Sequence, residues 1–326
     1  MGVKHLNRYL TEKCSSYSIR KMGFVEMRNQ TVVVDTSIYL YKFIEKGDLE
    51  ENMYLLLSLF REYGITPVFV FDGKPPPEKK ELLERRRAEK HIAETKYNEL
   101  CATVNAPDGP GKTDEIVAEL AALKKRFVRI HERDIQTVKR LITAYGMTYL
   151  ESKGEADQLC AYLVKHSYAW GCMSDDMDMF LYGCPRVIRH VSLLNHSAVV
   201  YDTSRILKEL GMGFSTFKDI MVLSGTDYIL GEKTSLNETL KLYSLYCILP
   251  FQSISFYDWL CKSTEYITDR QKLDRVHALF DLSSFGATNP HEVSAIMRAV
   301  PFKNKPLIMD DIRRIMEPTG FVFLGV

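Results

Sequence analysis

Two short hydrophobic runs rich in β-branched residues stand near the start of the chain, at Thr31–Val34 and Ile65–Phe71. Their hydrophobic positions are continuous rather than alternating, which is typical of strands buried on both faces of a parallel sheet. Between them, Met53–Tyr63 repeats hydrophobic residues at helical spacing. This pattern predicts a β-α-β unit in which the helix is the crossover between two parallel strands.

The alternation of strand and helix returns after residue 132. The predicted elements are a helix at Arg133–Tyr145 ended by Gly146, a strand at Met147–Leu150, a helix at Asp157–Lys165, and strands at Ala169–Met173 and Val187–Val191. Strands that alternate with helices indicate a doubly wound α/β fold. We therefore expect a mainly parallel, twisted sheet flanked by helices over roughly residues 1–230, and a mostly helical region after it.

A charged, helix-prone insertion separates the two sets, from Lys74 to about Arg133. Lys74–Lys90 holds seven basic and four acidic residues, and a second basic cluster lies at Lys124–Arg126. Such a run is typical of a solvated helix face and also of an anion-binding surface, so both interpretations stay open. The Pro- and Gly-rich segment Ala106–Gly111 predicts a break between two helical arms.

Composition narrows the class of protein. Hydrophobic residues make up 46% of the 326 residues and charged residues 26%, which excludes disorder over most of the chain. No hydrophobic stretch approaches the ~20 residues of a membrane-spanning helix. The net charge of +1 argues against a uniformly basic surface but allows opposite charges to gather in separate patches. The seven cysteines form no C-x-x-C pair and the N-terminus has no hydrophobic signal region, so we expect an intracellular, soluble protein.

Carboxylates stand at the ends of predicted elements: after three of the strands, at the start of the helix at Asp157–Lys165, and after the segment Met221–Gly225. The acids in question are Asp35, Asp72, Glu155, Asp157, Asp175, Asp176, Asp178 and Asp227. Because the carboxyl ends of parallel strands meet at one edge of a sheet, we expect these side chains to face one crevice. For any single acid, a helix or turn cap is the alternative. Glu155 and Asp157 are two residues apart, so they act together only if the helix begins between them.

A cluster of this kind repels itself. Two unit charges about 4 Å apart interact by roughly 4 kcal/mol at an effective dielectric near 20. Five or six carboxylates must therefore take up protons or bind cations, and oxygen ligands alone select Mg²⁺ or Mn²⁺. Such a site suits two ions that clamp the attacking and leaving oxygens of a phosphodiester.

Five segments, taken in order, resemble the motifs of the flap endonuclease family of structure-specific 5′ nucleases. They are Thr31–Tyr41, Val70–Pro76, Gly154–Asp157, Ser174–Asp178 and Leu223–Tyr228, with weaker support from Met1–Val3 and Ser204–Leu207. The resemblance covers about residues 1–230. It implies a PIN-like 5′ nuclease domain at 1–236 with a helical arch insertion at about 76–133, followed by a helical C-terminal region at 237–326. The implied activity is hydrolysis of DNA phosphodiester bonds near single-strand/duplex junctions, such as 5′ flaps, in replication, repair or recombination.

The resemblance also assigns roles to individual residues. Seven acids match the ligands of two Mg²⁺ ions, for which Mn²⁺ can substitute: Asp35, Asp72, Glu155, Asp157, Asp176, Asp178 and Asp227. Asp175 matches a position that is not a ligand. Lys79 and Arg85 match the arch residues that grip the scissile phosphate, in a register open by one to three residues because Lys80, Arg86 and Arg87 are adjacent. Tyr41 matches an aromatic ring that stacks on a nucleobase, the alternative being a core tyrosine beside Phe43, and Gly2 matches a glycine beside the active site.

The chain departs from the family pattern after the last motif. Tyr228–Asn237 keeps a single glycine, Gly231, of a glycine-rich hairpin that binds duplex phosphates, and places Glu232 beside it. No sliding-clamp peptide is apparent. We expect a divergent, compact member, as a virus could encode, acting as a monomer in the nucleus or at a cytoplasmic site of DNA replication. Two alternatives stay open: a 5′ ribonuclease of the same fold, and a catalytically silent nucleic-acid-binding module.

Overall fold

A seven-stranded sheet forms the centre of the computed structural model, which describes residues 3–106, 113–228, 234–249, 254–283, 285 and 289–323. The strand order is β1-β7-β6-β5-β2-β3-β4. The strands are β1 (Ile19–Gly23), β2 (Thr31–Asp35), β3 (Thr66–Phe71), β4 (Thr148–Glu151), β5 (Gly171–Met173), β6 (Arg186–Ser192) and β7 (Ser197–Asp202). The five strands β6, β5, β2, β3 and β4 pair in parallel, whereas β7 is antiparallel to both β6 and β1. The prediction of a mainly parallel sheet flanked by helices is confirmed.

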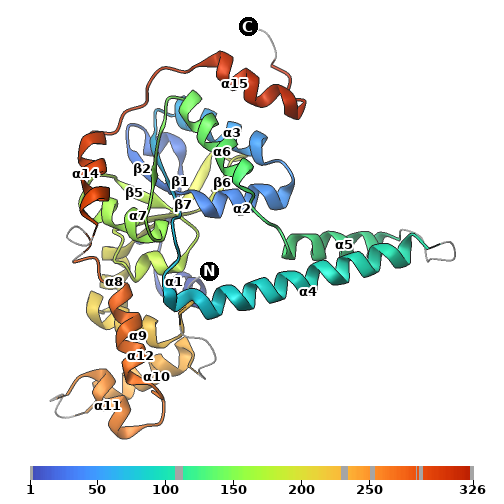
Figure 1. Ribbon diagram of the computed structural model, residues 1–326. Coiled ribbons are helices and arrows are strands. Elements are labelled where there is room, and N and C mark those ends of the chain that lie inside the picture. Colours follow the sequence, from blue (N-terminus) through green and yellow to red (C-terminus); the bar gives the residue numbers. More distant parts are fainter. Residues whose placement is uncertain are drawn as a thin grey trace.

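Helices cover both faces of the sheet (Figure 1). One face packs against α3 (Leu49–Glu62), α6 (Glu132–Ala144) and α15 (Met309–Met316), and the other against α7 (Ala156–Lys165) and α9 (Phe214–Leu223). The remaining helices are α1 (Leu6–Lys13), α2 (Thr36–Lys46), α4 (Lys80–Val104), α5 (Asp114–Arg126), α8 (Thr203–Leu210), α10 (Leu236–Cys247), α11 (Phe256–Ser263), α12 (Arg270–Leu279) and α14 (Pro290–Ala299). The layers are therefore helix, sheet and helix.

Strand β2 shows why its sequence is continuously hydrophobic. Val33 belongs to the core on the α7 side of the sheet, whereas Val32 and Val34 belong to the core on the α3 side. Side chains alternate between the two faces of a strand, and here both faces are covered by helices. All three valines are fully buried. The same reasoning applies to Val68 and Phe69 in β3, which enter opposite cores.

Most elements agree with the sequence pattern. The predicted strands correspond to β2, β3, β4, β5 and β6, and the predicted helices to α3, α6 and α7, with bounds that differ by up to four residues. The pattern did not predict β1 and β7. In β1 only Met22 is buried, so this edge strand carries almost no hydrophobic signal.

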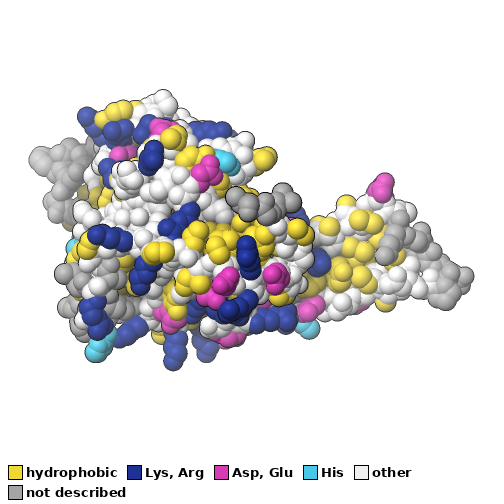
Figure 2. Space-filling view, turned by 90° about the horizontal axis from the view of Figure 1, so that it is seen from above, with side chains coloured by type: hydrophobic (Ala, Val, Ile, Leu, Met, Phe, Trp, Pro, Cys, Tyr) yellow, Lys and Arg dark blue, Asp and Glu magenta, His cyan; other side chains and the backbone are white. Residues whose placement is uncertain are grey.

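The charged insertion forms two helices that lie side by side and project from the body (Figure 1). Small and hydrophobic residues between the arms are buried, among them Ala93, Val104 and Leu123. Basic and acidic side chains are interspersed over the face seen in Figure 2, and hydrophobic side chains line the visible flank of the projection. The helical arms are thus as predicted, whereas the break expected between them at Ala106–Gly111 lies, apart from Ala106, outside the described residues.

The C-terminal region is helical and its last segment returns to the sheet. The backbone N–H of Lys305 donates to the carbonyl oxygen of Gly146 at 2.7 Å, and that of Ile308 to Ala144 at 2.8 Å. Helix α15 then packs on α6, where Ile312 is buried in the core. Residues before and after 236 thus share one hydrophobic core. The division into a nuclease domain at 1–236 and a C-terminal region at 237–326 stays a prediction. In the described part of the chain, no helix has both the length and the hydrophobicity to cross a bilayer.

Candidate active site

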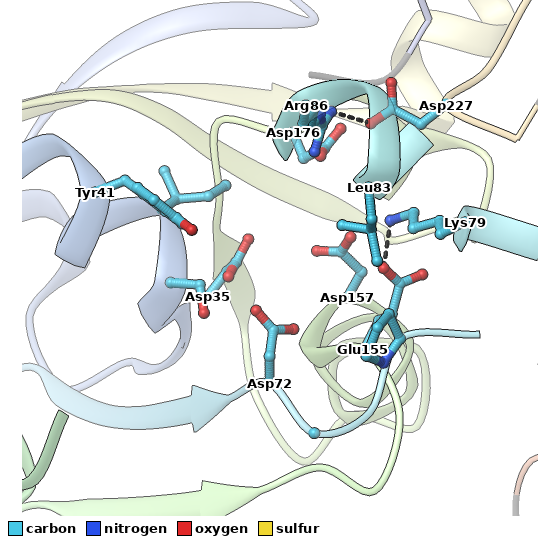
Figure 3. Close-up of a pocket in the computed structure, with 14 residues that line it drawn as sticks. Asp35, Tyr41, Asp72, Lys79, Leu83, Arg86, Glu155, Asp157, Asp176 and Asp227 are labelled. Atoms are coloured by element: carbon cyan, nitrogen blue, oxygen red, sulfur yellow. Dashed lines mark hydrogen bonds and ion pairs between the residues drawn. The ribbon is translucent and has the colours of Figure 1, made fainter. Parts of the chain in front are cut away.

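Six of the seven acids singled out above line one pocket of about 260 Å³ at the carboxyl ends of the parallel strands (Figure 3). They are Asp35, Asp72, Glu155, Asp157, Asp176 and Asp227. The seventh, Asp178, is 2% exposed and donates its backbone N–H to Asp176 Oδ1 at 3.0 Å. Side chains up to 192 residues apart in the sequence thus converge on one edge of the sheet.

The ends of β2 and β3 place the first two acids. Asp35 is the last residue of β2 and directly precedes α2. Asp72 follows β3, and its Oδ1 accepts a hydrogen bond from the Ala156 N–H at 2.7 Å. Next to it, a Cβ on Gly73 would collide with the carbonyl oxygens of Ser152 and Lys153. Only glycine lets the chain leaving β3 pass this close to the loop that carries Glu155.

Helix α7 begins at Ala156, with Glu155 as its N-cap in extended conformation. The start of the helix therefore lies between Glu155 and Asp157, which is the condition under which both carboxylates can face one site. Both line the pocket (Figure 3). This condition, drawn from the two-residue spacing, is met.

The turn after β5 ties two strands together through Ser174. The Ser174 hydroxyl donates to Asp35 Oδ2 at 2.9 Å and accepts a hydrogen bond from the Asp176 N–H at 3.1 Å. Asp176 in turn accepts from Asp178 N–H as the N-cap of a short 3₁₀ helix, Met177–Phe180. Sequence reasoning missed Ser174, although a hydroxyl directly before an Asp-Asp pair at a strand end is a local signal for such a turn.

The buried acids destabilise one another in the absence of a cation. Burial, together with repulsion from Asp72, raises the pKa of Asp35 to about 8. Burial and neighbouring carboxylates also raise the pKa of Asp157 and Asp178 well above the usual value for aspartate, and burial raises the pKa of Asp176. Asp178 Oδ1 is fully buried and has no hydrogen-bond partner among the described residues. These are the properties of a site that is stabilised by positive charge.

Two basic side chains from the arch supply part of that charge. Lys79 Nζ donates to Glu155 Oε1, and Arg86 Nη2 donates to Asp227 Oδ2 at 2.8 Å (Figure 3). Burial lowers the pKa of Lys79, but attraction to Glu155 outweighs it and brings the pKa to about 12. Tyr228, which the sequence argument did not single out, donates its hydroxyl proton to the other oxygen of Glu155.

The side chains of the pocket determine which metal ion it could bind. Among the described residues, no three Asp, Glu, His or Cys side chains are close enough as they stand to hold an ion. Lys79 and Arg86 hold Glu155 and Asp227 instead. The chemistry nevertheless fits a hard divalent cation, because six carboxylates line the pocket and Asp178, which donates its N–H to one of them, has a buried oxygen without a hydrogen-bond partner among the described residues.

The arch arginine that lines the pocket is Arg86 and not Arg85, and Arg86 lies within the register that the prediction left open. Lys79, Leu83 and Arg86 line the pocket at spacings of four and three residues, which places them on one face of the helical turn leading into α4. Arg85 is rotated away from this face, and its half-exposed side chain lies 3.8 Å from Glu89. Lys80 is exposed to solvent and does not line the pocket.

Tyr41 lines the pocket and is 44% exposed, so it is not a core residue. The tyrosine packed against Phe43 is Tyr39, with ring centroids 5.9 Å apart. Lys90 Nζ lies 5.0 Å from the centroid of the Tyr41 ring, a cation–π contact that sequence reasoning missed. Its signal was present, since Lys90 follows Arg86 by four residues on the same helical face.

A second cavity of about 590 Å³ adjoins the pocket at Tyr41 and Arg86. Its basic lining includes Arg87, Lys90 and Arg126, so Arg87 lies near the site but outside the carboxylate pocket. Gly2 lies outside the described residues, as do 229–233, which contain the departure from the family's duplex-binding hairpin.

Comparisons with known proteins agree with this architecture. The XPG N-terminal domain matches residues 1–93 and the XPG I-region matches residues 146–227, which together are more than half of the chain. Flap endonuclease 1 of Glycine max is 29% identical over 247 residues, 70% of this chain and 62% of the relative. The chain thus spans about six tenths of the length of this curated relative.

Solved structures show the same fold. The catalytic core of Rad2 in complex with DNA substrate is 22% identical, with a TM-score of 0.62 over 97% of this chain and 94% of that one. A Holliday junction-resolving enzyme, GEN1, in complex with product DNA, Mg²⁺ and Mn²⁺ ions, is 14% identical, with a TM-score of 0.60 over 97% and 72%. The two XPG regions contain the six acids that line the pocket and also Asp178, and the first of them extends into the arch insertion. The chain belongs to the flap endonuclease family.

Proposed function

We propose that this protein is a divalent-metal-dependent, structure-specific 5′ nuclease that hydrolyses phosphodiester bonds of DNA near single-strand/duplex junctions, such as 5′ flaps. One observation carries the proposal. Six carboxylates line a single pocket at the sheet edge, and the arch places two cationic side chains, Lys79 and Arg86, over the same pocket. Metal-assisted phosphodiester hydrolysis requires acidic side chains that bind the metal and, beside them, cationic side chains that bind the phosphate.

The seven acids, Asp35, Asp72, Glu155, Asp157, Asp176, Asp178 and Asp227, would hold two Mg²⁺ ions, with Mn²⁺ as a substitute. Bound there, the ions supply an activated water and stabilise negative charge on the phosphate. The raised pKa values of the buried aspartates support this assignment, because cations relieve the same repulsion that protons relieve. The GEN1 complex, with its Mg²⁺ and Mn²⁺ ions, is consistent with it.

Lys79 and Arg86 are proposed to bind the scissile phosphate. In the structure their N–H donors are directed at carboxylates within the pocket. When the carboxylates are occupied by metal, the same donors become available for phosphate oxygens, with Arg86 offering a planar, two-pronged contact. Tyr41 presents an exposed ring at the rim and is proposed to stack on the nucleobase next to the cut.

Two further functions of the same fold serve as alternatives for the test. A 5′ ribonuclease would use the same acids, whereas a silent binding module would have no use for buried carboxylates that repel one another. The Rad2 complex contains DNA, which favours DNA as the substrate here. Action as a monomer in DNA replication, repair or recombination, in the nucleus or at a cytoplasmic replication site, forms part of the proposal.

The decisive experiment compares initial cleavage rates on labelled 5′-flap DNA and on RNA of matched sequence, with and without Mg²⁺. We expect the DNA to be cleaved faster than the RNA, and we expect no cleavage without Mg²⁺. Asp72→Ala and Asp176→Ala should abolish cleavage yet keep flap binding, whereas Asp310→Ala, which removes an exposed acid at the start of α15, should cut normally. Wild-type rates in either pocket variant contradict the metal-site assignment. Faster RNA cleavage favours the ribonuclease, and binding without cleavage favours the silent module.

A further inference from the structure

Arg189 is a buried charged residue that the site described above does not use. It lies in β6, is only 6% exposed, and does not line the pocket. Its guanidinium makes two directed hydrogen bonds. Nη1 donates to Asn7 Oδ1 at 2.5 Å, and Nη2 donates to the backbone carbonyl oxygen of Asp175 at 2.9 Å. Both acceptors are neutral groups, so simple ion pairing does not account for burying this charge.

Asp175 is held by two consecutive residues of β6. While Arg189 binds its carbonyl oxygen, the backbone N–H of His190 donates to Asp175 Oδ1 at 2.8 Å. Lys42 Nζ, from α2, lies 3.7 Å from Asp175 Oδ2. Asp175 is therefore fixed through both its backbone and its side chain. This accounts for an acid that stands among the pocket acids in sequence but does not line the pocket.

Fixing Asp175 fixes the residues on either side of it. Ser174, which precedes it, donates to Asp35 and accepts from the N–H of Asp176. Asp176 then accepts from the N–H of Asp178. Arg189 is thus linked to two of the pocket acids, Asp35 and Asp176, by its bond to Asp175, by the backbone of the turn, and by the hydrogen bonds of Ser174. The turn has three attachments to β6, because the backbone N–H of Ser174 also donates to the carbonyl oxygen of Ile188 at 3.1 Å. If the Arg189 bond is lost, the turn keeps its internal bonds but loses the one side-chain donor among these three attachments.

We propose that Arg189 is a positioning residue that holds the Ser174–Asp178 turn, and with it the carboxylates of Asp176 and Asp178, in register with Asp35. The expected effect on metal binding rests on the proposed function, because that function includes the metal site. The positioning itself does not, because it is a property of the metal-free chain. Arginine suits this role because its planar fork can bind Asn7 and Asp175 at once. Lysine has one nitrogen and cannot span both acceptors in the same way.

The test measures hydrogen exchange at the backbone amides of Asp176 and Asp178 in metal-free protein. In Arg189→Met these amides should exchange about tenfold faster than in the wild type. The reason is that losing the bonds of Arg189 lowers the free energy of local opening of the Ser174–Asp178 turn. Arg189→Lys should give a smaller increase. Asn7→Ala should also give a smaller increase, because it removes one acceptor but leaves the bond to Asp175. Arg205→Met is the matched control, because Arg205 bonds to the Tyr17 carbonyl at 3.0 Å and leaves the turn intact.

A second measurement follows Mn²⁺ binding by paramagnetic resonance in the same variants. Loss of a supporting bond behind metal ligands typically lowers affinity 10- to 100-fold, so Arg189→Met should bind Mn²⁺ about tenfold more weakly at unchanged metal-free flap binding. Exchange at the wild-type rate in Arg189→Met overturns the inference, whatever the cleavage activity. If the amides exchange faster in Arg189→Met but the wild-type protein binds no Mn²⁺, the proposed function is overturned and the inference stands. Should Arg189→Met not fold, Arg189→Lys and Asn7→Ala decide by the same comparison.

Discussion

Neighbouring arginines at the start of the arch provide a matched pair of substitutions. Arg86 lines the pocket and donates to Asp227 at 2.8 Å, whereas Arg85 lies on the solvent side, 3.8 Å from Glu89. If the pocket binds the scissile phosphate, removing the side chain of Arg86 removes a phosphate donor. We therefore predict that Arg86→Ala slows cleavage of 5′-flap DNA by about 10- to 100-fold, and that Arg85→Ala stays within about twofold.

The magnitude follows from the contacts. Hydrogen bonds to charged groups contribute about 1.5–3 kcal/mol, which corresponds to roughly 10- to 150-fold in rate if the bond strengthens in the transition state. The Arg86–Asp227 pair contributes little to folding, because the Arg86 side chain is 38% exposed and water screens the pair. We expect the free energy of unfolding to change by under about 1 kcal/mol. A slow Arg86→Ala protein would thus be folded protein with impaired chemistry.

The assay is single-turnover cleavage with enzyme in excess over a labelled 5′-flap substrate, so that product release does not set the rate. Thermal unfolding of each variant checks folding. Arg86→Lys should recover part of the lost rate, because it restores the charge but not the two-pronged geometry. A larger rate loss in Arg85→Ala than in Arg86→Ala would refute the assignment of phosphate binding to Arg86 and would favour Arg85 instead.

Three further predictions rest on other parts of the site. Tyr41→Ala should weaken binding of single-stranded 5′ ends by about 5- to 100-fold, as expected for a lost base-stacking contact, while Tyr41→Phe should bind within about twofold, measured by fluorescence anisotropy. In EDTA, unfolding stability should fall as pH rises from about 4 towards 8. The pKa of Asp35 is raised in the folded state to about 8, so the folded protein binds the extra proton in this range. Added Mg²⁺ should flatten this dependence, and a rise of stability with pH in EDTA would contradict it. Gly73→Ala should lower the midpoint of thermal unfolding and the cleavage rate together, because its Cβ would meet the Ser152 and Lys153 carbonyls.

The sequence could predict the acids because their positions depend on local features. Asp35 and Asp72 follow strands whose hydrophobic runs are unmistakable, and a parallel sheet brings strand ends together whatever lies between them. The start of α7 could be stated as a condition, and the extended conformation of Glu155 meets it. These parts of the site follow from strand identity and strand direction, which the pattern of hydrophobic residues records.

The contacts of the arch could not be predicted in the same way. Arg85, Arg86 and Arg87 are chemically identical, so only the phase of the helix tells which of them faces the pocket. That phase is set by the short turn Pro77–Lys79 and the start of α4 at Lys80. An error of one residue rotates a helical side chain by about 100°, enough to move it from the pocket to solvent. The resemblance points first to Arg85, whereas Arg86 is the arginine that lines the pocket and Arg85 lies beside Glu89.

Long-range supports were beyond the sequence for a different reason. Arg189 and Asn7 are separated by 182 residues, and neither belongs to a recognisable motif. Their pairing depends on α1 packing near β6, which no periodicity encodes. Yet these contacts determine whether the acids, once gathered, keep a fixed geometry. An acidic cluster left to itself would spread apart, because each carboxylate is repelled by its neighbours. Three sets of hydrogen bonds oppose that repulsion: those of Ser174, that of the α7 N-terminus to Asp72, and that of Arg189 to Asp175. The site therefore depends on residues that carry none of its chemistry.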